Sequence, residues 1–328
     1  MRVGIIGDGA MGTVCSLILA GNGHDVRLWG HDAAVAAKHA AARENTTYLP
    51  GHGVPANVEF TADAGRAAEG AGFVVCAVPS QFIRPTLAKM AGVIPAGLAV
   101  VNVAKGIENS TLMRPTEIIV QVWGERPVAA LSGPNIAGEI ARKQPATMVV
   151  ASRDAALAKC VQQAFTCPYV RVYFNYDPVG VELAGAMKNV VAIAAGILDG
   201  MKIGYNAKAA LLSRGLVEIS RLGVALGAQA ETFAGLAGMG DLVTTCFSPE
   251  GRNRTFGERI GRGEKPADVL KSMVGVVEGV PTCKSVLALA ARCGVEMPIS
   301  EMLNAVLFEG KSPQEGIAGL MGREPKGE

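Results

Sequence analysis

The chain opens with MRVGIIGDGAMGTVCSLILAGNGHDVRLWG, Met1–Gly30, and this stretch decides the fold of its first half. A short apolar run, Arg2–Ile6, has the composition of a buried parallel strand. A glycine-rich turn follows, and then an apolar stretch to about Ala20 that is typical of a helix. Glycines end that helix, and Val26–Trp29 is typical of a second strand. This order of elements predicts the first unit of a doubly wound α/β sheet.

The turn after the first strand has the pattern GxGxxG. In this context the glycines let the backbone approach a pyrophosphate, and the N-terminus of the following helix attracts its charge. We therefore expect a dinucleotide at this turn, although a glycine-rich turn that binds nothing is the alternative. The predicted contacts are Gly7, Gly9, Ala10, Met11 and Gly12.

The end of the second strand selects between the two nicotinamide dinucleotides. An NAD-specific site usually has an acid there, which binds the ribose 2′-hydroxyl. In this chain the place falls at Gly30-His31, so the repulsion against a 2′-phosphate is missing and His31 would face it. We predict that NADP(H) is favoured and leave NAD(H) open. A shift of one residue would bring Asp32 into the place of the acid.

Three later apolar runs have the same form, in which a strand ends in polar or glycine residues. They are FVVCAVPSQ (Phe73–Gln81), LAVVNVAKGIE (Leu98–Glu108) and VAALSGPNIAGE (Val128–Glu139). Ligands of open parallel sheets bind beyond the carboxyl ends of the strands, so we expect these ends on one rim. A solitary Lys-Gly is usually a solvated turn. Lys105 is a better candidate for a functional residue because it shares the predicted rim with the other polar strand ends.

Two further segments complete the first half. The runs Ala146–Ser152 and Val170–Asn175, with a helical stretch between them, predict two more strands of the sheet. The segment from Arg43 to Thr61 is interpreted as a helix end followed by a loop, with no chemistry of its own.

From Val179 onward the periodicity is helical. Pro178 stands at or near a helix start, and the runs Lys208–Gly227, Cys283–Val295 and Ile299–Gly310 have apolar residues at three and four spacing. The sequence thus predicts a dinucleotide-binding domain over 1–178 and a helical substrate domain over 179–328. The last residues, Gly322–Glu328, are expected to form a loose tail.

Lys188 lies in a helix of small apolar residues, VELAGAMKNVVAIAAG, Val181–Gly196. Ala184 and Gly185 precede it by one turn, and Val191 and Ala192 follow it by one turn. One interpretation is a lysine that reaches from a core helix to water. The other is a functional ammonium group. All four histidines lie in the first 52 residues, so acid–base chemistry in the second half would have to use another group.

A glycine-rich passage of the second half carries an arginine cluster. Arg252-Asn253 follows Pro249-Glu250-Gly251, where a loop enters a helix, and such a site favours anions. The planar fork of arginine suits phosphate. A solvated basic face is the alternative, and a nucleic-acid site would need interleaved aromatic residues that this passage lacks.

Composition limits the remaining possibilities. The chain has 328 residues, of which 49% are hydrophobic and 18% charged, enough for two ordinary globular domains. Its net charge of +2 gives no reason to expect nucleic acid or an anionic membrane as a partner. Seven cysteines without a CxxC pair indicate free thiols in a reducing compartment, so a cytoplasmic location is expected. We expect no signal peptide, no membrane-spanning segment and no metal.

The motifs together resemble the bacterial-type NAD(P)-dependent sn-glycerol-3-phosphate dehydrogenases. GDGAMG, AVPSQ, AKGIE, LSGPN, ELAGAMKNVVAIAAG, LAGMGDLVTTC, GRNRTFGERIGRG and VVEGV follow one another in that order over nearly the whole chain. The resemblance implies a Rossmann-type domain followed by an all-α domain. It implies reversible reduction of dihydroxyacetone phosphate to sn-glycerol 3-phosphate for glycerophospholipid synthesis, in a homodimer.

The resemblance also assigns roles to residues. Lys188 would be the catalytic proton donor and acceptor, and Lys105 would touch both cofactor and substrate. The implied substrate contacts are Lys105, Gly133, Asn135, Lys188, Asp241, Gly251, Arg252 and Asn253. The implied cofactor contacts beyond the glycine-rich turn and His31 are Pro79, Lys105, Ala137, Arg252, Val276 and Glu278.

Two positions depart from the family. Asn135 stands where Ser or Thr is common, and Gly251 stands where Ser is common. The first change replaces a hydroxyl by an amide, and the second removes a hydroxyl that could contact phosphate. We expect activity to survive both changes and substrate affinity to be altered.

Two other functions fit part of the pattern. A β-hydroxyacid or 6-phosphogluconate-type dehydrogenase also combines a Rossmann domain, a helical domain and a lysine, but it acts on carboxylates. A protein that only senses nicotinamide would keep Gly7–Gly12 and have no need of Lys188, Asp241 and Arg252 together.

Overall fold

The computed structural model describes residues 1–324, so the predicted tail Gly322–Glu328 lies mostly outside the described residues. The chain forms two compact units. Unit 1 contains Met1–Lys105 and Met113–Glu182, and unit 2 contains Gly106–Leu112 and the chain from Leu183 onward. The division falls four residues beyond the predicted boundary at 178, and the short segment Gly106–Leu112 groups with the helical unit.

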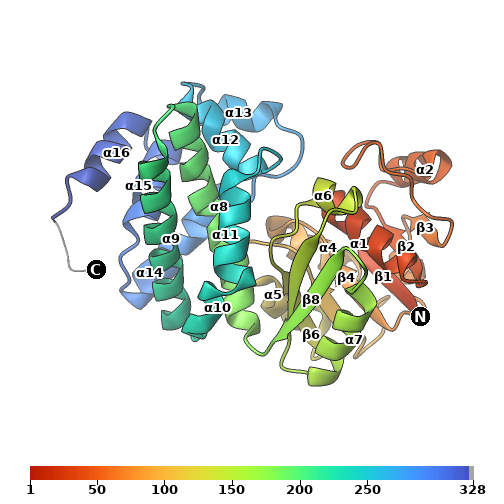
Figure 1. The fold of residues 1–328 in the computed structure, drawn as a ribbon. Coiled ribbons are helices and arrows are strands. Elements are labelled where there is room, and N and C mark those ends of the chain that lie inside the picture. Colours follow the sequence, from red (N-terminus) through yellow and green to blue (C-terminus); the bar gives the residue numbers. More distant parts are fainter. Residues whose placement is uncertain (325–328) are drawn as a thin grey trace. The chain divides into compact units, whose positions relative to one another are not determined.

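Unit 1 is built on one eight-stranded sheet with the order β3-β2-β1-β4-β5-β6-β7-β8 (Figure 1). Strands β1 to β6 are parallel, whereas β7 runs antiparallel to β6 and parallel to β8. The first six strands have the order of the doubly wound dinucleotide fold. The bounds are β1 Arg2–Ile6, β2 Asp25–Trp29, β3 Val58–Thr61, β4 Phe73–Cys76, β5 Val100–Asn102, β6 Val128–Ser132, β7 Ala146–Ala151 and β8 Val170–Asn175.

Helices cover both faces of this sheet, because its strands are apolar on both sides. One buried cluster joins the sheet to α1 (Ala10–Gly21), α6 (Ala137–Ala141) and α7 (Ala155–Phe165). A second cluster joins it to α3 (Ala64–Ala68), α4 (Ile83–Lys89) and α5 (Pro115–Trp123). The predicted α/β class of the first half is confirmed.

The interpretation of the segment from Arg43 to Thr61 as helix end and loop was wrong in one part. Helix α2 (Ala33–Ala42) does end before it, but Val58–Thr61 forms β3, which pairs in parallel with β2. The strand has only four residues and lies at the edge of the sheet, so its apolar signal is weak. Its pairing with β2, and not a long apolar run, makes it a strand.

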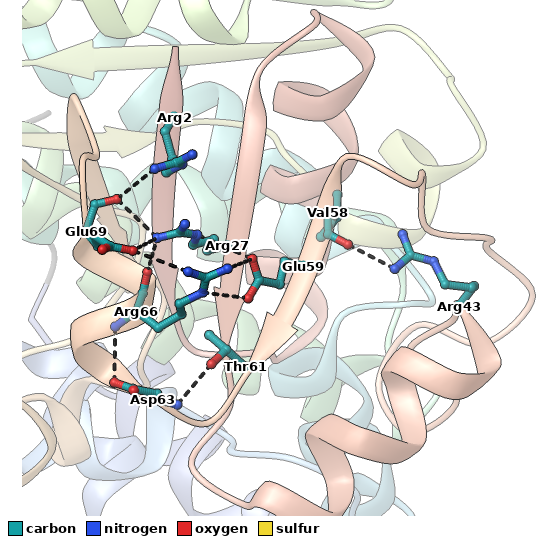
Figure 2. A network of polar contacts seen from close by, with 9 residues as sticks. All are labelled: Arg2, Arg27, Arg43, Val58, Glu59, Thr61, Asp63, Arg66 and Glu69. Carbon is teal, nitrogen blue, oxygen red and sulfur yellow. Dashed lines mark hydrogen bonds and ion pairs between the residues drawn. The ribbon is translucent and has the colours of Figure 1, made fainter.

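Arg27 ties β2, β3 and α3 together (Figure 2). It is buried, and its Nη1 donates to the carbonyl of Arg66 at 2.6 Å and to the Glu69 carboxylate at 3.0 Å. Its Nε lies 3.4 Å from Glu59 on β3. Hydrogen bonding from Arg66 lowers the pKa of Glu59, so this carboxylate stays charged. The network fixes the second strand, whose end is part of the site described below.

Unit 2 is helical, as expected, and contains no strand within the described residues (Figure 1). The helical part of the chain begins with the long helix α8, which starts at Pro178 as predicted and belongs to unit 2 from Leu183 onward. Its segments are α8 Pro178–Gly200, α9 Tyr205–Ala225, α10 Ala230–Ala234, the π-helical turn Leu236–Gly240, α11 Asp241–Phe247, α12 Arg252–Gly261, α13 Pro266–Ser272, α14 Gly279–Cys293, α15 Pro298–Phe308 and α16 Pro313–Met321.

Small residues of α8 let α12 pack closely against it. A Cβ built on Gly196 would collide with the backbone of Arg254, and one built on Gly257 would collide with the carbonyl of Ile193. Gly200 and Gly261 repeat this arrangement one turn further along. The glycines therefore place the start of α12, which carries Arg252 and Asn253, beside the helix that carries Lys188.

Helix α8 is also long and apolar enough to cross a membrane by length and composition alone, with a mean hydropathy of 1.6. Of the most apolar window, 94% is buried inside the protein. This burial is the pattern of a core helix.

Candidate active site

The glycine-rich turn has the steric requirements of a pyrophosphate-binding loop. Gly7 has φ +112°, and a Cβ there would lie 2.8 Å from the carbonyl of Ala77. A Cβ on Gly12 would collide with the carbonyl oxygen of Gly7, so this glycine permits close packing of α1 on β1. A Cβ on Gly9 would meet nothing within 4 Å. Gly9 thus faces open space, as a backbone approached by a ligand must.

The N-terminus of α1 is available to an anion. Gly9 is the N-cap of this helix and provides no side-chain cap, and no acid lies in the first turn. Within residues 1–324, the first N–H groups of the helix, around Ala10 and Met11, therefore have no side-chain cap. The residues of this turn fit the dinucleotide that the sequence predicts.

This loop is held by two side chains, Asn45 and Thr13, that the sequence analysis did not single out. Asn45, fully buried, donates to the backbone carbonyl of Asp8 at 2.7 Å and to Thr13 Oγ1 at 2.8 Å. Thr13 in turn donates to the carbonyl of Gly9 at 3.0 Å. Asn45 comes from the segment interpreted as featureless, and no signal in the sequence connects it to a loop more than 30 residues earlier.

Asp8 stands inside the loop and is 8% exposed. Burial raises the pKa of its carboxyl group, and the nearby His39 and His31 oppose the rise. The Nδ1 atom of His39 lies 3.7 Å from the Asp8 carboxylate. This ring nitrogen is buried and has no hydrogen-bond partner among residues 1–324.

Gly30, His31 and Asp32 directly follow β2, as the sequence analysis predicted. His31 is exposed just after Gly30. Asp32 caps α2, because its carboxylate accepts from the N–H groups of Ala34 at 2.8 Å and Val35 at 3.1 Å. The alternative in which Asp32 takes the place of the acid therefore has to compete with this cap.

Lys105 meets two of its predicted neighbours beyond the ends of β5 and β6. Its Nζ donates to the carbonyl of Gly133 at 3.0 Å and to Oδ1 of Asn135 at 2.7 Å. Asn135 is 7% exposed, so the amide that replaces the expected hydroxyl serves as an acceptor for the lysine. Gly133 has φ +116°, and a Cβ built on it would lie 3.1 Å from the carbonyl oxygen of Thr147.

The other predicted contacts of unit 1 lie at strand ends as well. Pro79 follows β4 and precedes the short turn Ser80–Phe82. Ala137 is the first residue of α6, directly after the loop that follows β6. Since β1, β2, β4, β5 and β6 are parallel, their carboxyl ends share one edge of the sheet. The polar residues at these strand ends therefore lie along one edge of the sheet in unit 1, as predicted.

Lys188 is buried and does not reach bulk water. The residue is 6% exposed, and its Nζ forms an ion pair with Asp241 Oδ1 at 2.5 Å. Nζ also donates to the hydroxyl of Thr245, one turn later on α11. Asp241 is 1% exposed and directly follows the π-helical turn, in which a Cβ on Gly238 would collide with the backbone of Phe233. The glycine-rich passage thus aims its aspartate at the buried ammonium group.

Asn253 joins three helices of unit 2. Its amide donates to Asn189 Oδ1 at 3.0 Å and accepts from the N–H of Gly279 at 2.9 Å. Asn189 follows Lys188 on α8, and Gly279 follows Glu278 at the start of α14. The geometry therefore brings Lys188, Asn253 and Glu278 into one region of unit 2.

Arg252 is exposed at the first position of α12 and has no ion-pair partner among the described residues. Its guanidinium lies against Gly275, the residue before Val276. A Cβ built on Gly275 would lie 2.5 Å from Arg252 Nη1. Gly251 is the N-cap of α12 and supplies no side-chain cap. An unpaired guanidinium at an uncapped helix start has the chemistry of an anion site.

Comparison with known proteins assigns the family. Residues 2–158 match the model of the NAD-dependent glycerol-3-phosphate dehydrogenase N-terminus, and residues 177–318 match that of its C-terminus. The glycerol-3-phosphate dehydrogenase (NAD(P)+) of Geobacter sulfurreducens is 47% identical over 330 residues, which covers 100% of this chain and 98% of the relative. This chain belongs to the NAD-dependent glycerol-3-phosphate dehydrogenase family.

Other members of the family agree. Glycerol-3-phosphate dehydrogenase (NAD(P)+) 2 of Mycobacterium bovis is 48% identical over 99% of this chain and 98% of its own length. The crystal structure of glycerol-3-phosphate dehydrogenase from Coxiella burnetii superposes with a TM-score of 0.95 at 34% identity, over 98% of this chain and 99% of that chain. The resemblance inferred from the motifs is confirmed, and the hydroxyacid-dehydrogenase and sensor alternatives lose their support.

Proposed function

We propose that this member of the glycerol-3-phosphate dehydrogenase family reduces dihydroxyacetone phosphate to sn-glycerol 3-phosphate with Lys188 as the proton donor and acceptor. The observation that carries the proposal is the burial of the Lys188 ammonium group against Asp241 and Thr245. A buried charge is costly and is retained where it has a partner or a task. Here it lies in the part of unit 2 that also holds Asn253 and the start of α12.

The proton is needed at the ketone oxygen. The reduced nicotinamide that Gly7–Gly12 are proposed to hold would supply the hydride for C2, and negative charge would then develop on that oxygen. Lys188 Nζ–H donates a proton to it, and in the reverse direction the amine accepts the proton from the alcohol. Acid–base catalysis of this kind is worth roughly 10²–10⁴ in rate. Asp241 neutralises the ammonium charge before the step, and the Thr245 hydroxyl holds Nζ in place.

Cations and helix N–H groups would bind the substrate phosphate. Arg252 lacks an ion-pair partner among residues 1–324 and stands at the start of α12, where Gly251 provides no side-chain cap. Backbone N–H groups there would take the place of the hydroxyl that Gly251 lacks. Lys105, oriented by the Gly133 carbonyl and Asn135, would contact substrate and cofactor. We assign to Asp241 and Asn253 the positioning of Lys188 and of α12, since both side chains are already engaged there.

The cofactor is a nicotinamide dinucleotide, and the residues proposed to hold it are Gly7–Gly12, His31, Pro79, Lys105, Ala137, Arg252, Val276 and Glu278. The open space at Gly9 and the absence of a side-chain cap from Gly9 on α1 support the assignment of Gly7–Gly12. The preference for NADP(H) predicted from the sequence assumed that the end of β2 is free of negative charge.

We also propose glycerophospholipid synthesis as the use of the product, in the cytoplasm and by a homodimer. All seven cysteines lie within the described residues and are free, which supports a reducing compartment. The dimer rests on the family resemblance alone, and light scattering on the purified chain tests it.

Oxidation of reduced cofactor by the purified protein tests the activity. We expect turnover with dihydroxyacetone phosphate and little with dihydroxyacetone or with keto forms of 3-hydroxy acids, because these lack the phosphate. Arg252→Ala should raise KM for dihydroxyacetone phosphate by about tenfold to hundredfold, the value of a charged hydrogen bond, and change the KM for the cofactor less.

Arg262→Ala is the matched control, because Arg262 belongs to the same basic passage but is 62% exposed in its side chain and pairs with Glu258. Its KM values should stay near those of the wild type. A larger effect of Arg252→Ala on the cofactor than on the substrate would refute the phosphate assignment.

A further inference from the structure

The carboxylate of Asp8 occupies the place where an NAD-selective acid would stand. A Cβ built on Gly30 lies 2.8 Å from Cγ and 3.3 Å from Oδ1 of Asp8. Gly30 directly follows β2, which is where the dinucleotide fold puts the acid that binds the ribose 2′-hydroxyl. A side chain at position 30 would collide with Asp8, so the two positions are alternatives for one carboxylate.

The strand register explains how a loop residue reaches this place. Ile6, the last residue of β1, pairs with Trp29, the last residue of β2. Asp8 and Gly30 therefore follow two neighbouring parallel strands at the same edge of the sheet. The side chain of Asp8 keeps 11% of its surface exposed, so a ligand hydroxyl can reach it.

The groups around this carboxylate hold its backbone in place, and one of them is left with an unsatisfied nitrogen. Asn45 fixes the backbone of Asp8, and His39 lies against the carboxylate with a buried Nδ1 that has no hydrogen-bond partner among residues 1–324. A buried polar atom without a partner usually marks a missing ligand or water.

The first arginine after β2 is already engaged by backbone carbonyls. Arg43 is the first arginine after β2, and its guanidinium donates to the carbonyls of Val54, Pro55 and Val58 (Figure 2 shows the last of these). His31 is exposed and stands beside the carboxylate of Asp32. Neither residue offsets a buried acid in the way that an arginine at the phosphate would.

We propose that Asp8 accepts a hydrogen bond from the adenosine ribose 2′-hydroxyl and repels a 2′-phosphate, so that this protein selects NAD(H) over NADP(H). The inference rests on the proposed dinucleotide site at Gly7–Gly12 and reverses the preference predicted from the sequence of β2. Selectivity here comes from a repulsive group as much as from an attractive one.

Isothermal titration of the wild-type chain with NAD⁺ and NADP⁺ tests the proposal without relying on turnover. We expect NAD⁺ to bind about tenfold more tightly or better, and Asp8→Asn and Asp8→Ala to reduce this ratio by about tenfold, mainly by strengthening the binding of NADP⁺. Asp32→Ser is the matched control, because it removes a neighbouring negative charge and keeps an oxygen to cap α2. Its ratio should match that of the wild type.

The outcomes separate the two proposals. Wild-type protein that binds NADP⁺ as tightly as NAD⁺, or a ratio that Asp8→Asn and Asp8→Ala leave unchanged, overturns the role of Asp8 and leaves the enzyme assignment intact. Failure to bind either dinucleotide overturns the site at Gly7–Gly12 and the inference with it. The wild-type ratio is decisive even if a variant does not fold.

Discussion

At the scale of single residues, the pair of Lys188 and Asp241 links stability to catalysis. Both groups are nearly inaccessible to water, and each is the other's counter-charge. Removing one partner of a buried pair leaves an uncompensated charge and costs roughly 3–5 kcal/mol, whereas replacing both can be close to neutral. The pair that the proposed reaction would use is therefore expected to contribute to the stability of unit 2.

We predict that Asp241→Asn lowers the free energy of unfolding by roughly 3–5 kcal/mol, because it leaves the ammonium group of Lys188 buried without a counter-charge. Adding Lys188→Met to this variant should restore part of the loss. Chemical denaturation of the wild type, both single variants and the double variant measures the coupling. Strictly additive effects would show that the two side chains do not interact.

Candidate site residues could be named from the sequence where they belong to a distinctive motif, and their roles stay predictions. Lys188, Lys105 and Asp241 could be named because their motifs are distinctive, yet the sequence did not indicate that Asp241 and Thr245 would hold the lysine. Asp8 shows the limit more clearly. Its identity is evident in GDGAMG, but its position against Gly30 depends on the pairing of Ile6 with Trp29, which no local pattern encodes.

At the scale of elements, one buried carboxylate holds the start of a helix. Glu218 on α9 accepts from the N–H groups of Ile299 at 2.6 Å and Ser300 at 3.4 Å, in the first turn of α15. Burial raises the pKa of Glu218 to about 7 from its usual 4.5, against the opposing effect of these hydrogen bonds. The folded protein therefore holds a proton that the unfolded chain releases at lower pH.

The sign of the pH dependence follows from this difference. Between about pH 4.5 and pH 7 the unfolded state binds fewer protons at this position, so the contribution of Glu218 to stability falls as the pH rises. The total loss is at most about 3.5 kcal/mol, since one pKa unit corresponds to about 1.4 kcal/mol. Glu218→Gln should remove this slope and be more stable than the wild type above pH 7.

Thermal unfolding of both proteins from pH 5 to about pH 8 makes the comparison. Glu309→Gln is a suitable control, because Glu309 ends the same helix α15, is exposed and does not contribute to the pKa shift of Glu218. Equal slopes for the wild type and Glu218→Gln would show that Glu218 does not titrate in this range.

Elements with their own apolar signal were predictable, and elements that depend on partners were not. The strands Arg2–Ile6 and Val170–Asn175 and the start of α8 at Pro178 agree with the sequence analysis residue by residue. The edge strand β3 was taken for a loop because four residues paired on one side carry little periodicity. The close packing of α12 on α8 also depends on two segments at once.

At the scale of the whole molecule, the chain combines a sheet unit that offers strand ends with a helical unit that offers a buried lysine. The order of motifs along the chain was enough to predict both units and the family. The strand order of unit 1 then explains why residues as distant in sequence as Gly9 and Asn135 belong to one edge. The proposed reaction requires groups of both units, and Lys188 is the group on which it depends.

Steady-state turnover of Lys188→Ala with dihydroxyacetone phosphate, measured together with its affinity for the reduced cofactor, tests this dependence most directly. The account predicts a loss of roughly 10²–10⁴ in kcat, with the affinity for the cofactor essentially that of the wild type. A variant that retains wild-type kcat, or one that loses turnover only because it no longer binds the cofactor, would contradict the assignment of Lys188 as the proton donor.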